Sequence, residues 1–366
     1  MKVDFQDIID IYDKEVRKNT KNKAKIYRFE RFKMQNLTNV YNVLTNNSYK
    51  YVKYNIFLIK HPKYRVVMSL DIKDKIINHY VTRFILMPKL EKYLDIRNVA
   101  TRKNMGRDYA LRLIKKDIEH FKYKDCCYVL KLDIKKFFYN INHQVLKDIL
   151  KDELTEEERN IVNVIIDSTD YDYINNSINK LKEKEVINNP KRRKEIEEMP
   201  PYSKGKGLPI GNMTSQFLSI FYLNKLDHDI VNKYHLKYFC KYMDDYIIFS
   251  ENKEYLKEIK LKIETTLNDE YRLNINSKKT KITSITEGFS FCGYRFRIID
   301  NKTVINVCAS TRNRVKKRIK EVKYLYINNY MSLQSTFCSI STYYNGFKFG
   351  SRKKMQRLVE NYFFKG

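Results

Sequence analysis

The sequence is poor in the residues that build several common kinds of site. It has only 9 glycines, no tryptophan and no glycine-rich phosphate loop, and its six cysteines form no C-x-x-C pair. That cysteine pattern favours reduced, packed thiols over a disulfide framework or a zinc site. No apolar run approaches the roughly 18 residues that a membrane span needs, and the N-terminus lacks the apolar core of a secretory signal. We therefore expect a cytoplasmic protein with no membrane partner.

Negative charge is scarce beside positive charge. The 366 residues include 72 Lys and Arg against 43 Asp and Glu, a net charge of +29. Such an excess is typical of a protein that binds a polyanion, and nucleic acid is the first candidate. A strong AT bias in the coding DNA would also enrich Lys, Asn, Ile and Tyr, so the charge alone leaves both interpretations open. At 43% hydrophobic residues the chain can bury a core, and its length suits two or three subdomains.

The apolar patterns of the first half predict helices and short strands in alternation. We expect polar helices over residues 1–60, then a strand at 66–68 and a helix whose apolar face holds Ile72, Ile76, Ile77, Tyr80 and Phe84. Residues 125–146 read as a strand that ends at a carboxylate, a turn and a helix. Residues 168–206 form the most charge-dense stretch, and we interpret them as an exposed insertion or mobile loop.

The second half continues the mixed pattern. A Gly-Pro-Gly turn leads into a helix within 207–231, and two strands flank a turn in 238–250. A helix over 253–268, a small β-ribbon at 288–296 and a basic helical tail from 310 follow. Because no long Gly/Ser linker divides the chain, we expect an α+β protein whose parts pack as one body.

Two adjacent aspartates lie in the otherwise apolar stretch "KYMDDYIIFS". Asp244 and Asp245 would occupy a hairpin tip, which by itself is an ordinary solvated turn. Asp133 ends another apolar strand, so three carboxylates meet at one edge if both strands belong to one sheet. A cluster of acids in a basic protein is explained if it holds Mg²⁺ ions, because two such ions can clamp the attacking and leaving oxygens of a phosphoryl transfer.

Five segments occur in the order and approximate spacing of the palm motifs of reverse transcriptases. They are "LDIKKFF", "GLPIGNMTSQFLSIFYLN", "KYMDDYIIF", "NINSKKTKI" and "FSFCGYRF", and a fingers-like pattern precedes them. The sequence resembles this family over about residues 63–298. The resemblance implies a right-hand polymerase fold, with fingers, a palm containing an antiparallel sheet and a short helical thumb. It also implies an RNA-directed DNA polymerase that uses two Mg²⁺ ions, with Mn²⁺ as a substitute, a template RNA, a DNA or RNA primer and deoxynucleoside triphosphates.

The resemblance divides the chain into five parts. We expect N-terminal helices and fingers in 1–125, the first part of the palm in 126–167, a charged insertion or fingers loop in 168–206, the second part of the palm with the primer grip in 207–298, and a basic helical thumb in 299–366. Only 68 residues follow residue 298, so we expect no separate RNase H, maturase or endonuclease domain.

The resemblance also assigns catalytic roles. Asp133 and Asp244 correspond to the ligands of the two metal ions, Asp245 to a supporting carboxylate, and the Ile134 carbonyl to an additional metal ligand. Lys279 is placed like the lysine that protonates the departing pyrophosphate. Lys278 is its competitor, and either lysine could instead be a solvated charge.

Further residues correspond to positions that meet the substrate. Arg102, in preference to Lys103, would contact the triphosphate because charged donors suit phosphate oxygens. Phe138 falls at the steric gate that excludes a 2′-hydroxyl, although a simple core phenylalanine is the alternative. The other candidates for substrate binding are Ile210, Gly211, Gln216, Tyr242 and Met243.

Two further segments resemble nucleic-acid-binding elements of the family. Cys292, Gly293 and Tyr294 correspond to the primer grip, where glycine lets a backbone approach the primer closely. The basic tail reads either as a thumb helix or as a solvated surface helix. Its candidate contacts to nucleic acid are Arg312, Arg314, Lys317 and Arg318.

One motif indicates a subgroup. Where many reverse transcriptases carry Gln-Gly and Ser-Pro, this chain has Ile210-Gly211 and Ser215-Gln216, which is similar to the error-prone enzymes of bacterial diversity-generating retroelements. Tyr139-Asn140 and the long insertion depart from that group. An antiviral defence-associated reverse transcriptase is therefore the alternative, and a catalytically inactive RNA-binding scaffold is the alternative of another class. A small accessory protein or a structured noncoding RNA would be a further partner.

Overall fold

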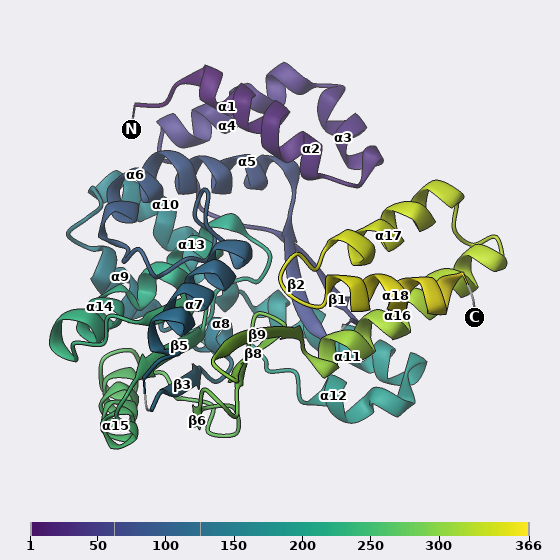
Figure 1. Cartoon of the computed structure of the whole chain (residues 1–366). Helices are drawn as coiled ribbons and strands as arrows, with labels where there is room; N and C mark the ends of the chain where they lie inside the picture. Colours follow the sequence, from purple (N-terminus) through teal and green to yellow (C-terminus); the bar gives the residue numbers. More distant parts are fainter. Residues whose placement is uncertain (1, 62, 125, 365–366) are drawn as a thin grey trace. The chain divides into compact units, whose positions relative to one another are not determined.

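The computed structural model describes residues 2–61, 63–124 and 126–364 (Figure 1). The chain divides into two compact units, each assembled from three stretches. The first unit contains Met1–Thr101, Ile134–Lys233 and Lys262–Ile275, and the second contains Arg102–Asp133, Tyr234–Leu261 and Asn276–Gly366. Both units combine helices with antiparallel strands, so the α+β class expected from the sequence is confirmed.

The first unit begins with a group of short helices that pack on α5 (Ile72–Tyr80) (Figure 1). Ile8, Leu37 and Ile76 are fully buried within this group. The expected helical face of α5 is buried at its first four positions, but Phe84 is 43% exposed and stacks on Tyr80. A π-helical turn, η2 (Val81–Leu86), changes the helical phase before Phe84. The N-terminal elements are α1 (Phe5–Ile11), η1 (Tyr12–Val16), α2 (Arg17–Asn19), α3 (Lys23–Glu30) and α4 (Lys33–Thr45).

A two-stranded hairpin follows these helices. Its strands, β1 (Tyr54–Ile59) and β2 (Arg65–Leu70), pair antiparallel from Tyr54 opposite Leu70 to Ile59 opposite Arg65. The expected strand at 66–68 is therefore confirmed and longer, whereas the expectation of helices throughout 1–60 is wrong for β1. Phe57 and Ile59 are 44% and 42% exposed, so apolar residues occupy both faces of β1 and hide its alternation.

Residues 168–206 are largely helical, and the expectation of a mobile loop is wrong. They contain α11 (Asp172–Asn188), a short turn at Pro190–Arg192 and α12 (Arg193–Glu197), after the 3₁₀ turn η4 (Asp167–Asp170). Ile174, Ile178 and Ile196 are fully buried, and α11 packs on β1. The many charged residues on the exposed faces mask this sparse apolar stripe in the sequence.

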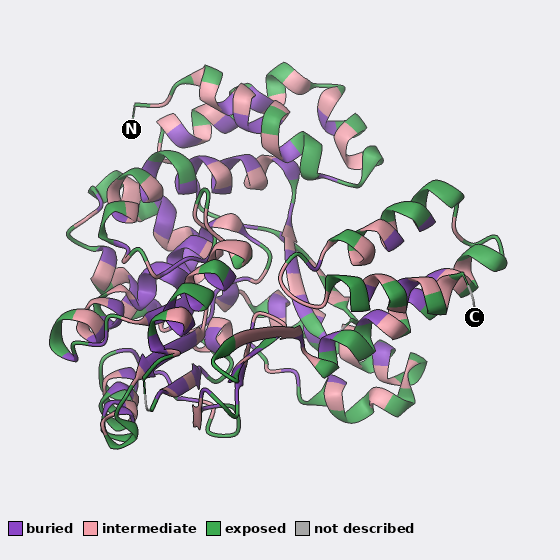
Figure 2. Ribbon diagram, in the orientation of Figure 1, coloured by how far each residue is buried: buried purple, intermediate pink, exposed green. Residues whose placement is uncertain are grey.

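The centre of the first unit is α13 (Met213–Tyr222). Every residue from Phe217 to Tyr222 is buried, as are Thr214 and Ser215 (Figure 2). The remaining helices are α6 (Met87–Leu90), α8 (Phe137–Asn140), α9 (His143–Leu150), α10 (Glu156–Ile166) and α14 (Asn224–His228), with the turns η3 (Glu91–Tyr93) and η6 (Asp229–Lys233).

The second unit contains a four-stranded antiparallel sheet in the order β4-β5-β3-β6. Helix α7 (Arg107–Phe121) packs on β4, and Phe121 stacks on Phe249 of β5. The chain leaves this unit within α15 (Lys253–Asp269). The strands are β3 (Tyr128–Asp133), β4 (Phe239–Tyr242), β5 (Asp245–Ser250) and β6 (Lys281–Ser284).

A second sheet and three helices complete this unit. The expected ribbon is the hairpin of β7 (Phe289–Phe291) and β8 (Tyr294–Ile299), to which β9 (Lys302–Val307) adds a third strand. The helices α16 (Ala309–Ile327), α17 (Leu333–Asn345) and α18 (Arg352–Phe363) pack against one another (Figure 1). Within the described residues, no helix combines the length and the apolar character that a bilayer crossing requires.

Candidate active site

Three carboxylates meet at one edge of the four-stranded sheet. Asp133 is the last residue of β3 and lies directly opposite Asp245, the first residue of β5. Asp244 lies in the two-residue turn between β4 and β5. The strand residues on either side of this turn, Tyr242 and Asp245, pair with each other. Antiparallel pairing therefore brings together residues that are more than one hundred positions apart in the sequence, as the sequence analysis expected for strands of one sheet.

Asp133 is held by a ring of donors from the segment that leads into β6. Its carboxylate accepts hydrogen bonds from Asn276 Nδ2 and Lys279 Nζ, each at 2.8 Å. Its backbone N–H donates to Thr280 Oγ1 at 3.2 Å, and its carbonyl accepts from the Asn276 N–H at 2.7 Å. Because Asp133 is only 6% exposed, these bonds fix the carboxylate at the sheet edge.

Burial and the neighbouring negative charges together act on the remaining two carboxylates. Burial, followed by the negative charge of Asp245, raises the pKa of Asp244 to about 6. Burial also raises the pKa of Asp245; Lys131 opposes this shift, and the charge of Asp133 adds to it. Partial burial alone would lower the pKa of Lys279, but its hydrogen bond to Asp133 and the surrounding carboxylates outweigh it and raise that pKa. The site therefore has an excess of negative charge that a bound cation would relieve.

The donor set fits a magnesium ion. Mg²⁺ prefers oxygen ligands, and one or two carboxylates together with substrate phosphates are its usual protein site. Each carboxylate oxygen of Asp133 accepts one hydrogen bond and keeps a second lone pair for a metal. The carboxylates at this edge are therefore suited to hold divalent metal ions.

Both turns beside the carboxylates have left-handed backbone. Met243 has φ of 58°, and the β7–β8 turn has φ of 47° at Cys292 and 86° at Gly293. In the β7–β8 turn both central residues have positive φ. This is the geometry of a type I′ hairpin, which favours glycine. Burial, with a contribution from the charge of Asp245, raises the pKa of Cys292 to about 12. Lys131 Nζ of β3 donates to the Ser290 carbonyl of β7 at 2.9 Å, which ties the sheet of the candidate primer-grip hairpin to the strand that ends at Asp133.

The basic candidates of the second unit differ in exposure. Arg102 is half-buried just before α7, whereas Lys103 is exposed. On α16, Arg312, Arg314 and Lys317 are exposed. Arg318 is half-buried and forms an ion pair with Glu321 at 2.9 Å, so the exposed cationic surface of α16 does not depend on it.

The first unit holds the other candidates. Phe138 is half-buried and packs edge-to-face on Phe137, with ring centroids 5.8 Å apart. Its carbonyl accepts a hydrogen bond from the Leu208 N–H at 2.8 Å, which ties it to the segment that precedes Ile210. Ile134 is buried and bridges to Ile275.

The Ile210-Gly211 turn lies on β2. The Ile210 carbonyl accepts from the Met68 N–H at 2.9 Å, and Gly211 has φ of 119°. A Cβ at Gly211 would lie 3.0 Å from Val67 Cγ1 and 3.3 Å from the Met68 carbonyl oxygen, so this close approach requires glycine. Gln216 follows as a half-buried residue of α13.

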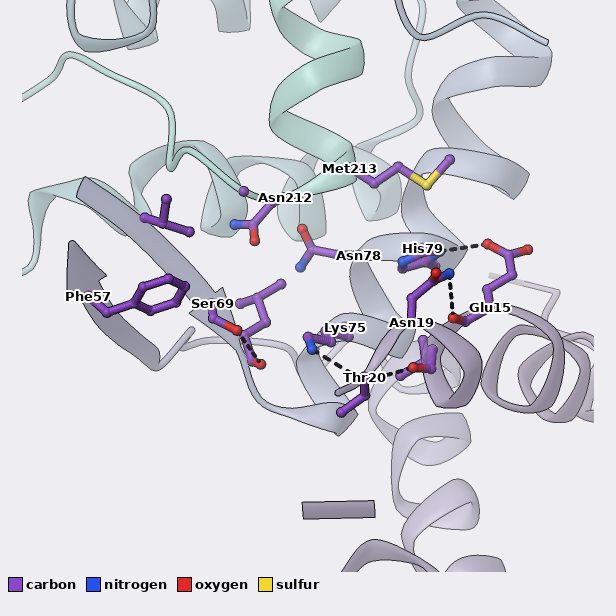
Figure 3. A pocket seen from close by; sticks show the side chains of 14 residues that line it. Glu15, Asn19, Thr20, Phe57, Ser69, Lys75, Asn78, His79, Asn212 and Met213 are labelled. Atoms are coloured by element: carbon purple, nitrogen blue, oxygen red, sulfur yellow. Dashed lines mark hydrogen bonds and ion pairs between the residues drawn. The ribbon is translucent and has the colours of Figure 1, made fainter. Parts of the chain in front are cut away.

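A pocket opens beside this turn. Its volume is about 260 Å³, and Gly211, Asn212 and Met213 form part of its lining. Figure 3 shows Asn212 and Met213 on one side of the pocket and Lys75 and Thr20 on the opposite side. The N-terminal helices thus contribute to a polar cavity beside the Ile210-Gly211 motif, a feature that the sequence analysis missed.

Asn276 and Thr280 are further partners of Asp133 that were not predicted from the sequence. Both belong to the segment "NINSKKTKI", whose lysines are the candidates that the resemblance indicates. The available signal was the pair of polar residues Asn276 and Thr280, which lie four positions apart on either side of Lys279.

An antiparallel sheet that presents paired carboxylates, within a strongly basic chain, is the arrangement expected of a nucleic-acid polymerase. The family "Reverse transcriptase (RNA-dependent DNA polymerase)" matches residues 53–296, about two thirds of the chain. The chain belongs to this family and is an RNA-directed DNA polymerase, a nucleotidyltransferase that binds a nucleic-acid template and nucleotides. No individual curated protein matches the sequence significantly.

Proposed function

We propose that this reverse transcriptase is the error-prone enzyme of a diversity-generating retroelement, which copies a template RNA from a DNA or RNA primer. The observation that supports catalysis is the register of the sheet, which pairs Asp133 with Asp245. The observation that supports low fidelity is an apolar residue, Ile210, before the close-packed Gly211. The five parts expected from the sequence are proposed as the fingers, palm, insertion and thumb of this enzyme.

In the proposed reaction, Asp133 and Asp244 would hold two Mg²⁺ ions, with Asp245 and the Ile134 carbonyl in support. The ions would supply the charge that stabilises the attacking and leaving oxygens. Lys279 donates a proton to the departing pyrophosphate. The same hydrogen bond that raises the pKa of Lys279 keeps this donor at Asp133 until substrate arrives.

The remaining candidates position the substrates. Arg102 meets the triphosphate, and Lys103 provides further positive charge. Phe138 lies beneath the sugar and excludes a 2′-hydroxyl, while Tyr242 and Met243 support the incoming nucleotide. The Cys292-Gly293-Tyr294 turn holds the primer end, and the exposed cations of α16 contact the duplex backbone.

Ile210 is proposed to lower the selectivity for the correct base pair. A glutamine at this position can donate and accept hydrogen bonds, whereas isoleucine offers only shape and apolar contact. A mismatched base that leaves a polar group unpaired loses more binding free energy than one that loses the packing of a single methylene group. Ile210 and Gln216 together therefore support the assignment to the error-prone group.

The test is the misincorporation spectrum of the wild type and of Ile210→Gln on one RNA template that contains all four bases. Fewer errors, chiefly opposite adenine, are expected for Ile210→Gln, and Ile210→Leu serves as the apolar control. Identical spectra for the wild type and Ile210→Gln, at comparable activity, would contradict the role of Ile210.

The helical insertion also supports a second candidate, an antiviral defence reverse transcriptase. The insertion α11–α12 and Tyr139-Asn140 depart from the pattern of the diversity-generating group. Sequencing of the neighbouring DNA separates the two roles. Near-duplicate repeats that differ at adenines support diversification, whereas a structured noncoding RNA without such repeats supports defence, with that RNA or a small accessory protein as the partner.

A further inference from the structure

A histidine and two aspartates of the first unit converge at the base of the helical insertion. His143 is the first residue of α9, and Asp167 and Asp170 are the two ends of η4. His143 Nδ1 lies 3.3 Å from Asp167 Oδ1 and 3.5 Å from Asp170 Oδ2, and one ligand atom from each residue falls within 4.8 Å of the others. None of these residues has a role in the proposed polymerase reaction.

The hydrogen bonds of His143 define the orientation of its ring. His143 is 3% exposed, and its Nε2 lies 2.7 Å from the Gly207 carbonyl oxygen. Because a carbonyl oxygen only accepts, Nε2 carries the hydrogen. Nδ1 is buried and makes no hydrogen bond of acceptable geometry with any described residue. In the neutral ring its lone pair therefore faces two carboxylate oxygens, an arrangement that a cation between them would stabilise.

The second atom of each acidic side chain is already occupied. Asp167 Oδ2 accepts from Lys147 Nζ at 2.6 Å, and Asp170 Oδ1 accepts from the Gly205 N–H at 2.9 Å. His143 is fixed in the same way by its Nε2–H bond to Gly207. Each residue of the cluster therefore has one polar atom bound by the protein and another that faces the other two residues. Supporting bonds of this kind orient the ligands of metal sites, where a histidine donates its other N–H to a carbonyl or carboxylate.

The two separations from His143 Nδ1 are closer to a zinc geometry than to a magnesium geometry. At zinc–ligand bond lengths of about 2.0–2.1 Å, a tetrahedron separates its ligand atoms by roughly 3.3–3.4 Å. The observed separations from Nδ1 are 3.3 and 3.5 Å. An octahedral Mg²⁺ with similar bond lengths would need roughly 2.9 Å between adjacent ligands. The imidazole nitrogen also suits zinc better than magnesium.

We propose that His143, Asp167 and Asp170 bind one Zn²⁺ ion, with water as the fourth ligand. Asp167 and Asp170 are partly exposed, at 42% and 23% of their side-chain surface, which gives the ion and the water a path from solvent. The zinc ion joins α9 to η4, and the hydrogen bonds of His143 and Asp170 tie both to the 205–207 loop. It thereby fastens the base of the α11–α12 insertion to the segment that leads to Ile210.

The test measures the zinc content of the full chain in an Asp133→Asn/Asp244→Asn background, which removes the candidate catalytic metal ligands. After equilibration with zinc and gel filtration, we expect about one zinc per chain, as for a structural site. His143→Gln, whose amide can still donate to Gly207, and Asp170→Asn should lose this ion. Asp172→Asn removes a nearby exposed charge outside the cluster and should retain it.

Thermal unfolding provides a second readout. Chelation should lower the melting temperature of the parent but leave that of His143→Gln unchanged, because a ligand that binds only the folded state stabilises it. If His143→Gln does not fold, the zinc dissociation constant of Asp170→Asn replaces it and should rise at least tenfold. Equal zinc content in the parent and in the cluster variants, or no zinc in the parent, would overturn the proposal.

Discussion

Replacing Asp244 by asparagine should stabilise the metal-free protein while it destroys the candidate metal site. Burial and the neighbouring carboxylates raise the pKa of Asp244 from 3.8 to about 6. In the unfolded chain this side chain loses its proton near its ordinary pKa, whereas in the folded chain it keeps the proton up to about pH 6. Between these values the folded state binds more protons, so the free energy of unfolding falls as the pH rises.

The size of this effect follows from the shift. About two pKa units correspond to about 3 kcal/mol at 1.36 kcal/mol per unit, and partial exposure of Asp244 reduces the expected value to about 2 kcal/mol. Asparagine has a similar shape and no charge, so Asp244→Asn should be more stable than the wild type by about this amount at pH 8 and by little at pH 4. Part of the pH dependence should remain, because the pKa of Asp245 is also raised.

The assay is urea unfolding of both proteins between pH 4 and pH 8.5 in magnesium-free buffer, with the exposed Asp152→Asn as the control. Addition of Mg²⁺ at pH 8 should stabilise the wild type more than Asp244→Asn, because the ion relieves the repulsion only where the carboxylate is present. Equal stability of the two proteins at every pH, or a less stable Asp244→Asn at pH 8, would refute the electrostatic account of the site.

Two other predictions concern substrate and nucleic-acid contacts. Phe138→Val should incorporate ribonucleotides because removal of the half-buried ring leaves room for the 2′-hydroxyl, and single-nucleotide incorporation kinetics measure this; an active variant that still rejects ribonucleotides makes Phe138 a packing residue. Neutralising Arg314, Lys317 and Arg318 together should flatten the dependence of RNA affinity on salt, since each phosphate contact releases a counterion, with most of the change due to the exposed Arg314 and Lys317. An unchanged slope in a filter-binding titration would show that the charge of α16 is merely solvated.

The three carboxylates of the candidate site could be predicted from the sequence, but the residues that support them could not. Asp133, Asp244 and Asp245 stand out because carboxylates interrupt apolar strands, and motif order places them in one sheet. Their register, with Asp133 opposite Asp245, depends on pairing between distant strands. The hydrogen bonds that join Asp133 to Asn276 and Thr280 arise from the same long-range pairing, which no local pattern encodes.

The fold was least predictable where apolar and polar residues do not separate cleanly. In the insertion, a few buried isoleucines, such as Ile174 and Ile196, are outnumbered by exposed charges. In β1, exposed Phe57 and Ile59 remove the alternation that indicates a strand. The cluster around His143 was missed because its aspartates lie more than twenty residues away, in a spacing that matches no metal motif.

The central claim is that the edge formed by Asp133, Asp244 and Asp245 is the polymerase active site. The most direct measurement is extension of a primer on an RNA template by the wild type, Asp133→Asn and Asp244→Asn, with RNA affinity measured in parallel. Loss of a metal ligand should lower the rate of extension by several decades, while RNA affinity stays close to the wild-type value because the basic surface is intact. Near-normal extension by either variant, at equal RNA affinity, would contradict the claim.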